Sequence, residues 1–279
     1  MLFAGTETAA RIERAECDLL RGAAAAFAAA EPRCDPFVRE IAGGVAVFTE
    51  EGMPFNKLAG LGFAGMPDPA ELDQVEEELR RRTSRLQVEV SSLGDPGVAA
   101  LLSRRGYTLE GIENVLGRVL PATDAGAAPA DGIDIVELAA GDQDPWTDVV
   151  LVGFQAPDEI GVPSHESFER GPLERAMRVF ARVDGMRRYL VTRHGHPAGG
   201  GSLRLSSEGV AQLCGAATLP AHRRRGIQSL LLSRRLADAA AAGCDVAVVT
   251  TQPGSKSHEN AHRRGFALLY VRSVLVKEW

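Results

Sequence analysis

One pattern in this chain recurs at a constant distance, and it limits the fold more than any other feature. Segments of the first half return 159 positions later, as position 263 does relative to position 104. The matching segments are Val90–Ser92 with Val249–Thr251, Arg104–Tyr107 with Arg263–Phe266, and Val115–Leu116 with Val274–Leu275. Several matches at one offset indicate two copies of a single module.

A segment without regular-structure formers separates the two copies. Residues 121–132 read Pro-Ala-Thr-Asp-Ala-Gly-Ala-Ala-Pro-Ala-Asp-Gly, and small, polar and helix-breaking residues of this kind are typical of a linker. We therefore predict a first domain over residues 1–121, a linker over 122–132 and a second domain over 133–279.

Hydrophobic periodicity in the second copy alternates between the two regular structures. The patterns predict strands over 133–138, 187–193, 201–205, 210–219, 246–251 and 268–277, and helices over 144–154, 164–180, 227–242 and 257–265. This order predicts the α/β class, an α+β arrangement in which helices cover a mixed sheet. Ligands of such sheets bind where the carboxyl end of a strand meets the start of a helix.

The best candidate for such a site follows the predicted strand 210–219. Pro220 leads into Arg223-Arg-Arg-Gly-Ile-Gln228, and a helix pattern begins at once. The unpaired N–H groups and the positive dipole end of a first helical turn favour anions, and arginines add charge-assisted donors. Gly226 lets the backbone approach a ligand closely. A solvated basic turn is the plainer alternative, but the flanking strand and apolar helix favour an anion site.

The same turn carries a family resemblance. Arg223-x-x-Gly226-x-Gln228 resembles the Gln/Arg-x-x-Gly-x-Gly/Ala pyrophosphate loop of the GNAT N-acetyltransferases, which bind acetyl-CoA. Gln228 departs from that pattern, because a small residue is usual at its position. Thr218-x-Pro220 resembles the end of the family's fourth strand, and the segment 260–266 resembles its Asn…Gly-Phe helix end. The resemblance covers residues 132–279 and implies a GNAT-like fold for them.

This resemblance implies a set of contacts to acetyl-CoA. In GNAT enzymes the fourth and fifth strands splay apart and expose backbone N–H groups to the pantetheine and the acetyl carbonyl. Carried over, the backbone of Ala217, Thr218 and Leu219 would make these contacts, and Asn260 would contact the cofactor. The pyrophosphate would bind the turn made of Arg223, Arg224, Arg225, Gly226, Ile227, Gln228 and Ser229.

The corresponding turn of the first copy has the opposite character. It reads Phe63-Ala-Gly-Met-Pro-Asp-Pro69, contains no arginine and places Asp68 where an anion would sit. A carboxylate at that position repels a pyrophosphate. We therefore expect the first copy to be a degenerate GNAT domain that binds no CoA, with one active site per chain.

Two positions of the second copy depart from the family's acid–base scheme. Many relatives have a glutamate base on the fourth strand and a tyrosine acid four residues before the Gly-Phe pair. Here these positions are Gln212 and Ala261. Neither side chain exchanges a proton at neutral pH, so other groups must act.

Six groups are candidates for these roles. Ser257 and Asn260 are candidates for contact with the cofactor sulfur, and Tyr270 is the candidate proton donor. The candidates for a base that acts through water are Glu166, Asp158 and the terminal carboxylate of Trp279. Packing on the last strand is the alternative role for Tyr270, and a helix-end hydrogen bond is the alternative for Asn260.

A rival motif lies at residues 258–262. His258-Glu-Asn-Ala-His262 matches HExxH, the zinc-protease signature, in which Glu259 would be the base. Three features count against it: Gly265 ends the predicted helix three residues later, Glu278 is the only later carboxylate side chain, and the matching segment 99–103 has no histidine. We therefore predict that the site holds no metal.

Composition limits the possible partners. The formal net charge of −6 argues against nucleic-acid binding, because a phosphate-tracking surface needs excess positive charge. The four cysteines form no CxxC pair, the start shows no secretion signal, and no apolar stretch approaches the roughly 20 residues that span a bilayer. We expect a cytoplasmic monomer or homodimer with neither membrane nor nucleic-acid partners.

Together these features predict an N-acetyltransferase. It would move the acetyl group of acetyl-CoA to an amine of a small molecule or peptide by direct attack in a ternary complex, a reaction that needs mainly positioning. A non-catalytic CoA-binding or interaction protein is the alternative, because the usual acid and base are missing. A zinc hydrolase built on HExxH is the third interpretation.

Overall fold

Residue contacts divide the chain into two compact units in the computed structural model, and neither unit is continuous in sequence. Unit 1 comprises Met1–Leu2, Leu116–Val162 and Phe180–Ala267. Unit 2 comprises Phe3–Val115, Pro163–Val179 and Leu268–Trp279. The structure describes residues 3–121, 132–139, 145–156 and 168–279, so the predicted linker lies outside the described residues except for Gly132.

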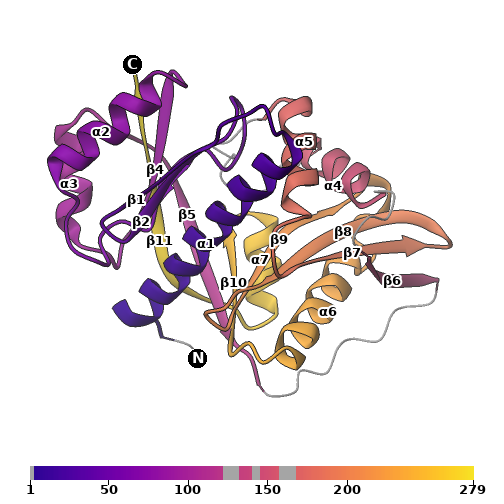
Figure 1. Cartoon of the computed structure of the whole chain (residues 1–279). Helices are drawn as coiled ribbons and strands as arrows, with labels where there is room; N and C mark the ends of the chain where they lie inside the picture. The colour runs from indigo at the N-terminus through magenta and orange to yellow at the C-terminus, as the bar shows by residue number, and fades with distance from the viewer. Residues whose placement is uncertain (1–2, 122–131, 140–144, 157–167) are drawn as a thin grey trace. The chain divides into compact units, whose positions relative to one another are not determined.

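Unit 1 contains the basic turn within a sheet that has helices on both faces. Its strands are β6 (Ile133–Leu138), β7 (Met186–Arg193), β8 (His196–Leu205), β9 (Val210–Thr218) and β10 (Val246–Thr251), and its helices are α4 (Pro145–Gln155), the 3-10 turn η1 (Pro220–His222), α6 (Ile227–Ala241) and α7 (Lys256–Arg263). The strand order is β6-β7-β8-β9-β10. Neighbouring strands are antiparallel except β9 and β10, which are parallel. Helices α4 and α6 pack against opposite faces of β8 (Figure 1).

Strand β8 begins at His196, earlier than the predicted strand 201–205, and it includes three consecutive glycines. Gly199 and Gly200 belong to β8, whereas the predicted strand begins only at Gly201. A Cβ atom on Gly200 would lie 2.9 Å from Cδ1 of Trp146 on α4, and one on Gly201 would lie 3.3 Å from Cζ of Arg235 on α6. Successive residues of a strand face opposite sides, so the glycines let helices on both faces approach the sheet.

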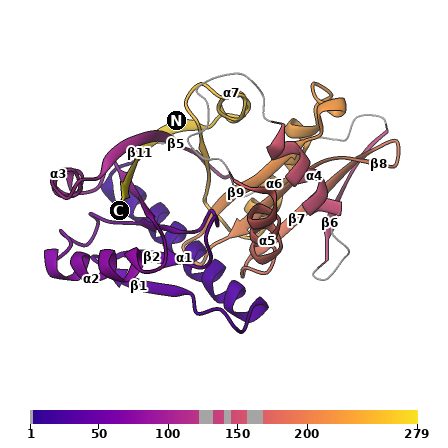
Figure 2. The same cartoon turned by 90° about the horizontal axis from the view of Figure 1, so that it is seen from above.

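Unit 2 has strands, helices and a core of its own. Its elements are α1 (Thr6–Ala30), β1 (Phe37–Ile41), β2 (Gly44–Phe48), β3 (Lys57–Ala59), α2 (Pro69–Arg80), β4 (Arg85–Ser91), α3 (Pro96–Arg104), most of β5 (Thr108–Val119), most of α5 (Arg170–Phe180) and most of β11 (Ala267–Glu278). The strand order is β1-β2-β3-β4-β11-β5, with β3 and β4 parallel. Helix α1 packs against β1, β2 and β3, and α2 packs against β1 and β4 (Figure 2).

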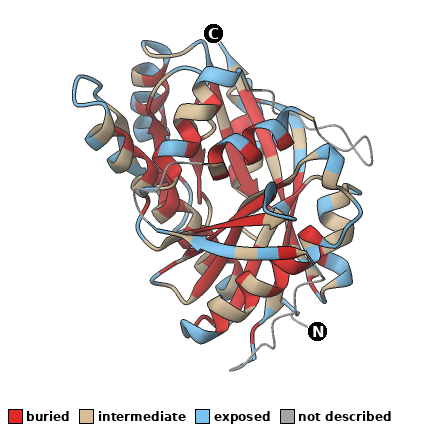
Figure 3. Ribbon diagram, turned by 90° about the vertical axis from the view of Figure 1, so that its right-hand side faces the viewer, coloured by how far each residue is buried: buried red, intermediate tan, exposed pale blue. Residues whose placement is uncertain are grey.

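Buried residues concentrate on the strands and on the helix sides that face them (Figure 3). The core of unit 2 is centred on aliphatic side chains that are fully buried, including Leu58, Leu72, Val88 and Leu102. Among the described residues, no helix has both the length and the apolar composition to cross a bilayer.

The elements of the two copies repeat at the predicted offset. Strand β11 starts and ends 159 positions after β5, since 267 follows 108 and 278 follows 119 by that number. Strand β3 likewise matches the last three residues of β9, and α2 matches α6. Both copies also pair these strands in parallel with the next strand, β3 with β4 and β9 with β10. The repeat seen in the sequence is therefore a repeat of structure.

The copies exchange residues of their last strands, because unit 2 contains β11 from Leu268 and unit 1 contains β5 after Val115. β11 closes the second copy in sequence, but it pairs antiparallel with β4 of the first copy from Arg272↔Ser91 to Glu278↔Arg85. In return, residues after Val115 belong to unit 1, where the N–H of Leu120 donates to the carbonyl of Asp245 at 2.8 Å. The contact-based units therefore do not follow the order of the two copies, because β11 from Leu268 belongs to unit 2 and the end of β5 after Val115 belongs to unit 1.

Candidate functional site

The basic turn leaves the first turn of α6 without a cap. Gly226 occupies the cap position in the left-handed conformation (φ 82°), and no side chain accepts a hydrogen bond from the helix start. The first closing bond runs from the Leu230 N–H to the Gly226 carbonyl at 2.9 Å. The N–H groups of residues 227–229 therefore have no acceptor within the helix. A Cβ on Gly226 would meet no atom within 4 Å, so the space beside Gly226 at the start of the helix is open.

The matching helix of the first copy is capped. The carboxylate of Asp68 accepts the Ala70 N–H at 2.8 Å, and Pro69 has no N–H to offer. The two copies thus differ in whether a side chain caps the first turn of the matching helix. The start of α2 is capped by a carboxylate, whereas the start of α6 has no side-chain cap.

The three arginines of the turn have different environments. The guanidinium of Arg223 is half-buried and donates to the carbonyl of Ala156, just after α4. Arg224 and Arg225 are exposed, and no side-chain hydrogen bond or ion pair among the described residues engages them. Arg224 has a φ of 59°, a conformation that L-residues rarely adopt. Arg223 therefore ties the turn to α4, while the other two are available to an anion.

Gln228 has a local partner that accounts for its departure from the family pattern. Its Nε2 donates to Oγ1 of Thr218 at 2.8 Å. The bond joins the first turn of α6 to the end of β9. A small residue would leave this link unmade, so here the side chain braces the turn.

Strands β9 and β10 separate beyond their first residues, as the resemblance implied. Their parallel register covers only Val210 to Gln212 against Val246 to Val248. On its other edge, β9 bulges: Ser202 pairs with Cys214 and Gly200 with Ala217, so residues 215 and 216 face Gly201 together.

The bulge orients one N–H group that the sequence analysis did not single out. Oγ of Ser202 donates to the Cys214 carbonyl at 2.8 Å, which holds that carbonyl toward β8. In a trans peptide the C=O and the following N–H point in opposite directions, so the Gly215 N–H points away from β8. The Gly215 N–H lies on the edge of β9 that faces β10, beyond the last residue of β9 that pairs with β10. The sequence signal for this group was a glycine inside an apolar strand pattern. In the structure, Gly215 has a positive φ of 55°.

The three predicted strand contacts are not equivalent. Ala217 and Thr218 pair with Gly200 and Gly199. The N–H of Leu219, in contrast, donates to the Ala198 carbonyl at 3.0 Å. Leu219 is therefore a weaker candidate for a cofactor contact, because its donor already has an acceptor.

The predicted catalytic residues fall in different places. Ser257 is exposed in the first turn of α7, and Asn260 is half-buried on the same helix. Tyr270 belongs to unit 2, is 4% exposed and donates from its hydroxyl to Oε1 of Glu13 at 2.7 Å. Glu166 and Asp158 lie outside the described residues.

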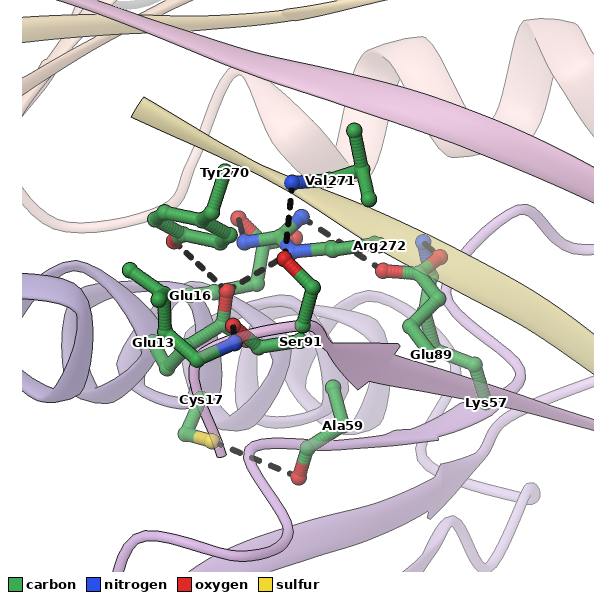
Figure 4. Close-up of polar contacts among 12 residues, drawn as sticks. Glu13, Glu16, Cys17, Lys57, Ala59, Glu89, Ser91, Tyr270, Val271 and Arg272 are labelled. Carbon is green, nitrogen blue, oxygen red and sulfur yellow. Dashed lines mark hydrogen bonds and ion pairs between the residues drawn. The ribbon is translucent and has the colours of Figure 1, made fainter. Parts of the chain in front are cut away.

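The environment of Tyr270 disfavours the role of proton donor to a substrate. Burial raises the pKa of its hydroxyl well above the ordinary value, and the neighbouring Glu13 carboxylate adds to this. Arg272 lies beside Glu13, at 2.8 Å from Nε to Oε1, and Glu89 lies 3.5 Å from its Nη1 (Figure 4). Tyr270 is thus a member of a buried ionic cluster, and a general acid needs access to the reacting atoms.

Gln212 is engaged by a buried arginine. Its Oε1 accepts from Nη1 of Arg204, its register partner on β8, at 2.6 Å, and both residues are buried. The position that carries a glutamate base in many relatives is therefore part of a cross-strand hydrogen bond here.

The HExxH segment does not have the arrangement of a zinc site. Nδ1 of His258 accepts the Gly254 N–H at 3.2 Å, and Glu259 forms ion pairs with Lys256 and Arg263. No group of three His, Cys, Asp or Glu side chains converges within the described ranges.

Comparisons with known proteins relate the chain to one family and one fold. Residues 155–266 match the sequence model of the acetyltransferase (GNAT) family. No curated protein shows a significant match to the chain. A GCN5-related N-acetyltransferase from Kribbella flavida is similar over 96% of this chain and 95% of its own, with a TM-score of 0.67 and 19% identity.

Two further solved structures share the fold. A tandem GNAT protein from the clavulanic acid biosynthesis pathway matches over 84% of this chain and 78% of its own (TM-score 0.60, 16% identity). A GCN5-related N-acetyltransferase from Sphaerobacter thermophilus matches over 74% and 65% (TM-score 0.53, 15% identity). Residues 155–266 are therefore similar to the acetyltransferase (GNAT) family, and the chain shares the fold of a GCN5-related N-acetyltransferase and of a tandem GNAT protein.

Proposed function

We propose that the second copy is an N-acetyltransferase that moves the acetyl group of acetyl-CoA to an amine of a small molecule or peptide. The observation that carries the proposal is the uncapped start of α6 beside exposed arginines, in contrast to the capped start of α2 in the same chain. N–H groups, a helix dipole and guanidinium groups together suit a diphosphate.

The transfer itself needs positioning and charge stabilisation. In this proposal, the amine nitrogen attacks the thioester carbonyl in a ternary complex, the C–S bond breaks, and the nitrogen gives its proton to water. The Gly215 N–H stabilises the developing negative charge on the carbonyl oxygen, and the backbone of Ala217 and Thr218 lies along the pantetheine.

The proposal assigns the proton transfers to side chains. The exposed Ser257 relays a proton to the leaving thiolate, and Asn260 contacts the sulfur. Glu166 stays the predicted base, which accepts the proton of the amine through water.

The first copy has no second site in this proposal. Asp68 caps α2, and the strands that match β9 and β10 carry an ionic network of their own. Lys57, 159 positions before Ala216, pairs with the buried Glu89 at 2.5 Å, and Glu89 also contacts Arg272. A CoA molecule would have to displace both the cap and these charges.

One amine panel tests the proposal. The full chain is mixed with acetyl-CoA and small amines or peptides, and release of free thiol is followed. Turnover with any member supports the proposal. Micromolar CoA binding without turnover across the panel would instead support a non-catalytic CoA-binding protein, which the hydrogen-bonded Gln212 in place of a glutamate favours.

Removing one loop arginine has a defined expected effect. Arg225→Ala should raise KM for acetyl-CoA about three- to tenfold and leave kcat almost unchanged, because an exposed charge contributes about 1 kcal/mol to binding a phosphate. The difference should shrink as salt is added. Arg80→Ala, which removes an exposed arginine of unit 2, is the matched control. An unchanged KM in Arg225→Ala at low salt would contradict the loop assignment.

Replacing Tyr270 separates its structural from its catalytic role. Tyr270→Phe should leave kcat within about twofold of the wild type and lower the free energy of unfolding by about 1.5–3 kcal/mol, because the hydroxyl binds a charged group. Steady-state thiol release and urea unfolding measure the two quantities. A large loss of kcat at unchanged stability would restore Tyr270 as the proton donor.

A further inference from the structure

Arg235 of α6 is a buried cation with an unusual set of partners. Its Nε donates to the Leu231 carbonyl at 3.2 Å, and its Nη1 donates to the carbonyls of Ser202 at 3.0 Å and Cys214 at 3.4 Å. Only 4% of the residue is exposed, and no carboxylate of the described residues forms an ion pair with it. Buried charges are normally paired with an opposite charge. A guanidinium held only by carbonyl oxygens therefore requires an explanation.

The sheet is built to admit this guanidinium at the bulge. A Cβ on Gly201 would lie 3.3 Å from Cζ and 3.4 Å from Nη1 of Arg235, so any other residue would crowd the guanidinium. Gly201 is also the residue of β8 that faces the two unpaired residues of β9. The charge thus lies where the regular pairing of the two strands is interrupted.

Arg235 binds both sides of that interruption. The Ser202 carbonyl belongs to β8 and the Cys214 carbonyl to β9, immediately before the bulge. The Cys214 carbonyl also accepts from Oγ of Ser202, so two donors fix its direction. The orientation of the next peptide group, which carries the Gly215 N–H, follows from that direction.

We propose that Arg235 is a positioning residue for acyl transfer, which fixes the β9 bulge so that the Gly215 N–H is aimed at the thioester carbonyl. The proposal rests on the proposed function of the second copy. Arg235 does not touch the reacting atoms, since it acts through the carbonyls of Ser202 and Cys214. Hydrogen bonds from a charged donor are stronger than neutral ones, which suits the task of holding an irregular backbone.

The state of Arg235 agrees with this role. Burial lowers the pKa of its guanidinium to about 10, so it keeps its charge at neutral pH. Its neighbour Arg234 differs: its Nε donates to Asp238 at 2.9 Å on the same helix, and its guanidinium lies over the ring of Tyr189. Arg234 therefore provides a matched control that removes an equal charge from α6 without touching the bulge.

Three variants test the proposal. Arg235→Met should lower kcat by roughly ten- to hundredfold, because a misplaced donor loses much of its effect on the transition state. KM for acetyl-CoA and Kd for CoA should stay within about threefold, since the anion-binding turn lies about two helical turns away. Arg235→Lys should recover most of kcat, because its ammonium can donate to both carbonyls. Arg234→Met should change neither quantity.

Hydrogen exchange provides a readout that does not need turnover. Amides of residues 213–218 should exchange faster in Arg235→Met than in the wild type or in Arg235→Lys. A folded Arg235→Met with unchanged kcat and unchanged exchange would overturn the proposal. So would a variant in which kcat and CoA affinity fall together and lysine rescues neither, because that pattern indicates support of the core alone. If the wild type acetylates no amine, the proposed function fails, and unchanged exchange in Arg235→Met would then overturn the claim about the bulge separately.

Discussion

Gly226→Asp is expected to raise Kd for CoA by on the order of a hundredfold relative to Gly226→Asn, with little change in stability. The two substituted side chains have nearly the same shape, and both Asp and Asn tolerate the left-handed conformation of this position better than other non-glycine residues. Both fit the open space around Gly226 and can cap the helix. The carboxylate alone adds a negative charge a few ångströms from the bound diphosphate, and such a repulsion amounts to a few kcal/mol near a protein surface.

This pair reproduces in the second copy what Asp68 does in the first. Isothermal titration with CoA gives Kd for the wild type and both variants, and thermal unfolding checks that each is folded. Gly226→Asn should itself weaken binding modestly, because the introduced amide side chain competes for the donors at the start of α6. Equal affinities for the two variants would mean that no diphosphate binds at this helix start, and the assignment of the turn would fail.

Arg272→Met is expected to lower the free energy of unfolding by about 3–5 kcal/mol, because it leaves buried carboxylates without their cation. The side chain of Arg272 is 3% exposed, and those of Glu13 and Glu89 are 2% and 0% exposed. Lys57 remains beside Glu89, but Glu13 has lost its only cation in the cluster. Among the described residues, Oε2 of Glu13 has no hydrogen-bond partner. Loss of the bond from Arg272 would leave this carboxylate with still less compensation for its burial.

Urea unfolding of the full chain measures this loss. The double variant Arg272→Met with Glu13→Gln should recover part of it, because the uncompensated charge is then gone. Amides of β4 and β11 should exchange faster in the single variant, since Arg272 joins β11 to α1 and β4. A loss below about 1 kcal/mol in Arg272→Met would show that the cluster does not hold the exchanged strand.

The location of this cluster bears on how the two copies depend on each other. β11 ends the second copy, yet its buried residues complete the core of unit 2, where Leu275 packs with the residues of that core. We propose that neither copy folds as an independent domain, because unit 2 contains β11 of the second copy and unit 1 contains the end of β5 of the first copy. The boundaries at 121 and 133 stay a prediction from the sequence repeat.

Local features of the candidate site could be predicted from the sequence. The basic turn, the glycine at the start of α6 and the carboxylate of Asp68 at the matching turn involve residues within a few positions of one another. Capping and hydrophobic periodicity act over such short distances, so the residues themselves specify the structure. The repeat was also visible, because the corresponding elements kept their spacing.

Only the tertiary structure decided the remaining features. Tyr270 meets Glu13 across 257 positions, and Arg235 meets Ser202 across 33. Gly199 and Gly200 precede the predicted strand, but in the structure they belong to β8, where helices pack against both faces. Nothing in a local pattern specifies such partners, because they are selected by which arrangement of strands buries the most apolar surface and pairs the most buried polar groups. The sequence by itself therefore determined the repeated module and its basic turn, whereas long-range packing determined which strand residues join each unit and which charges are buried with them.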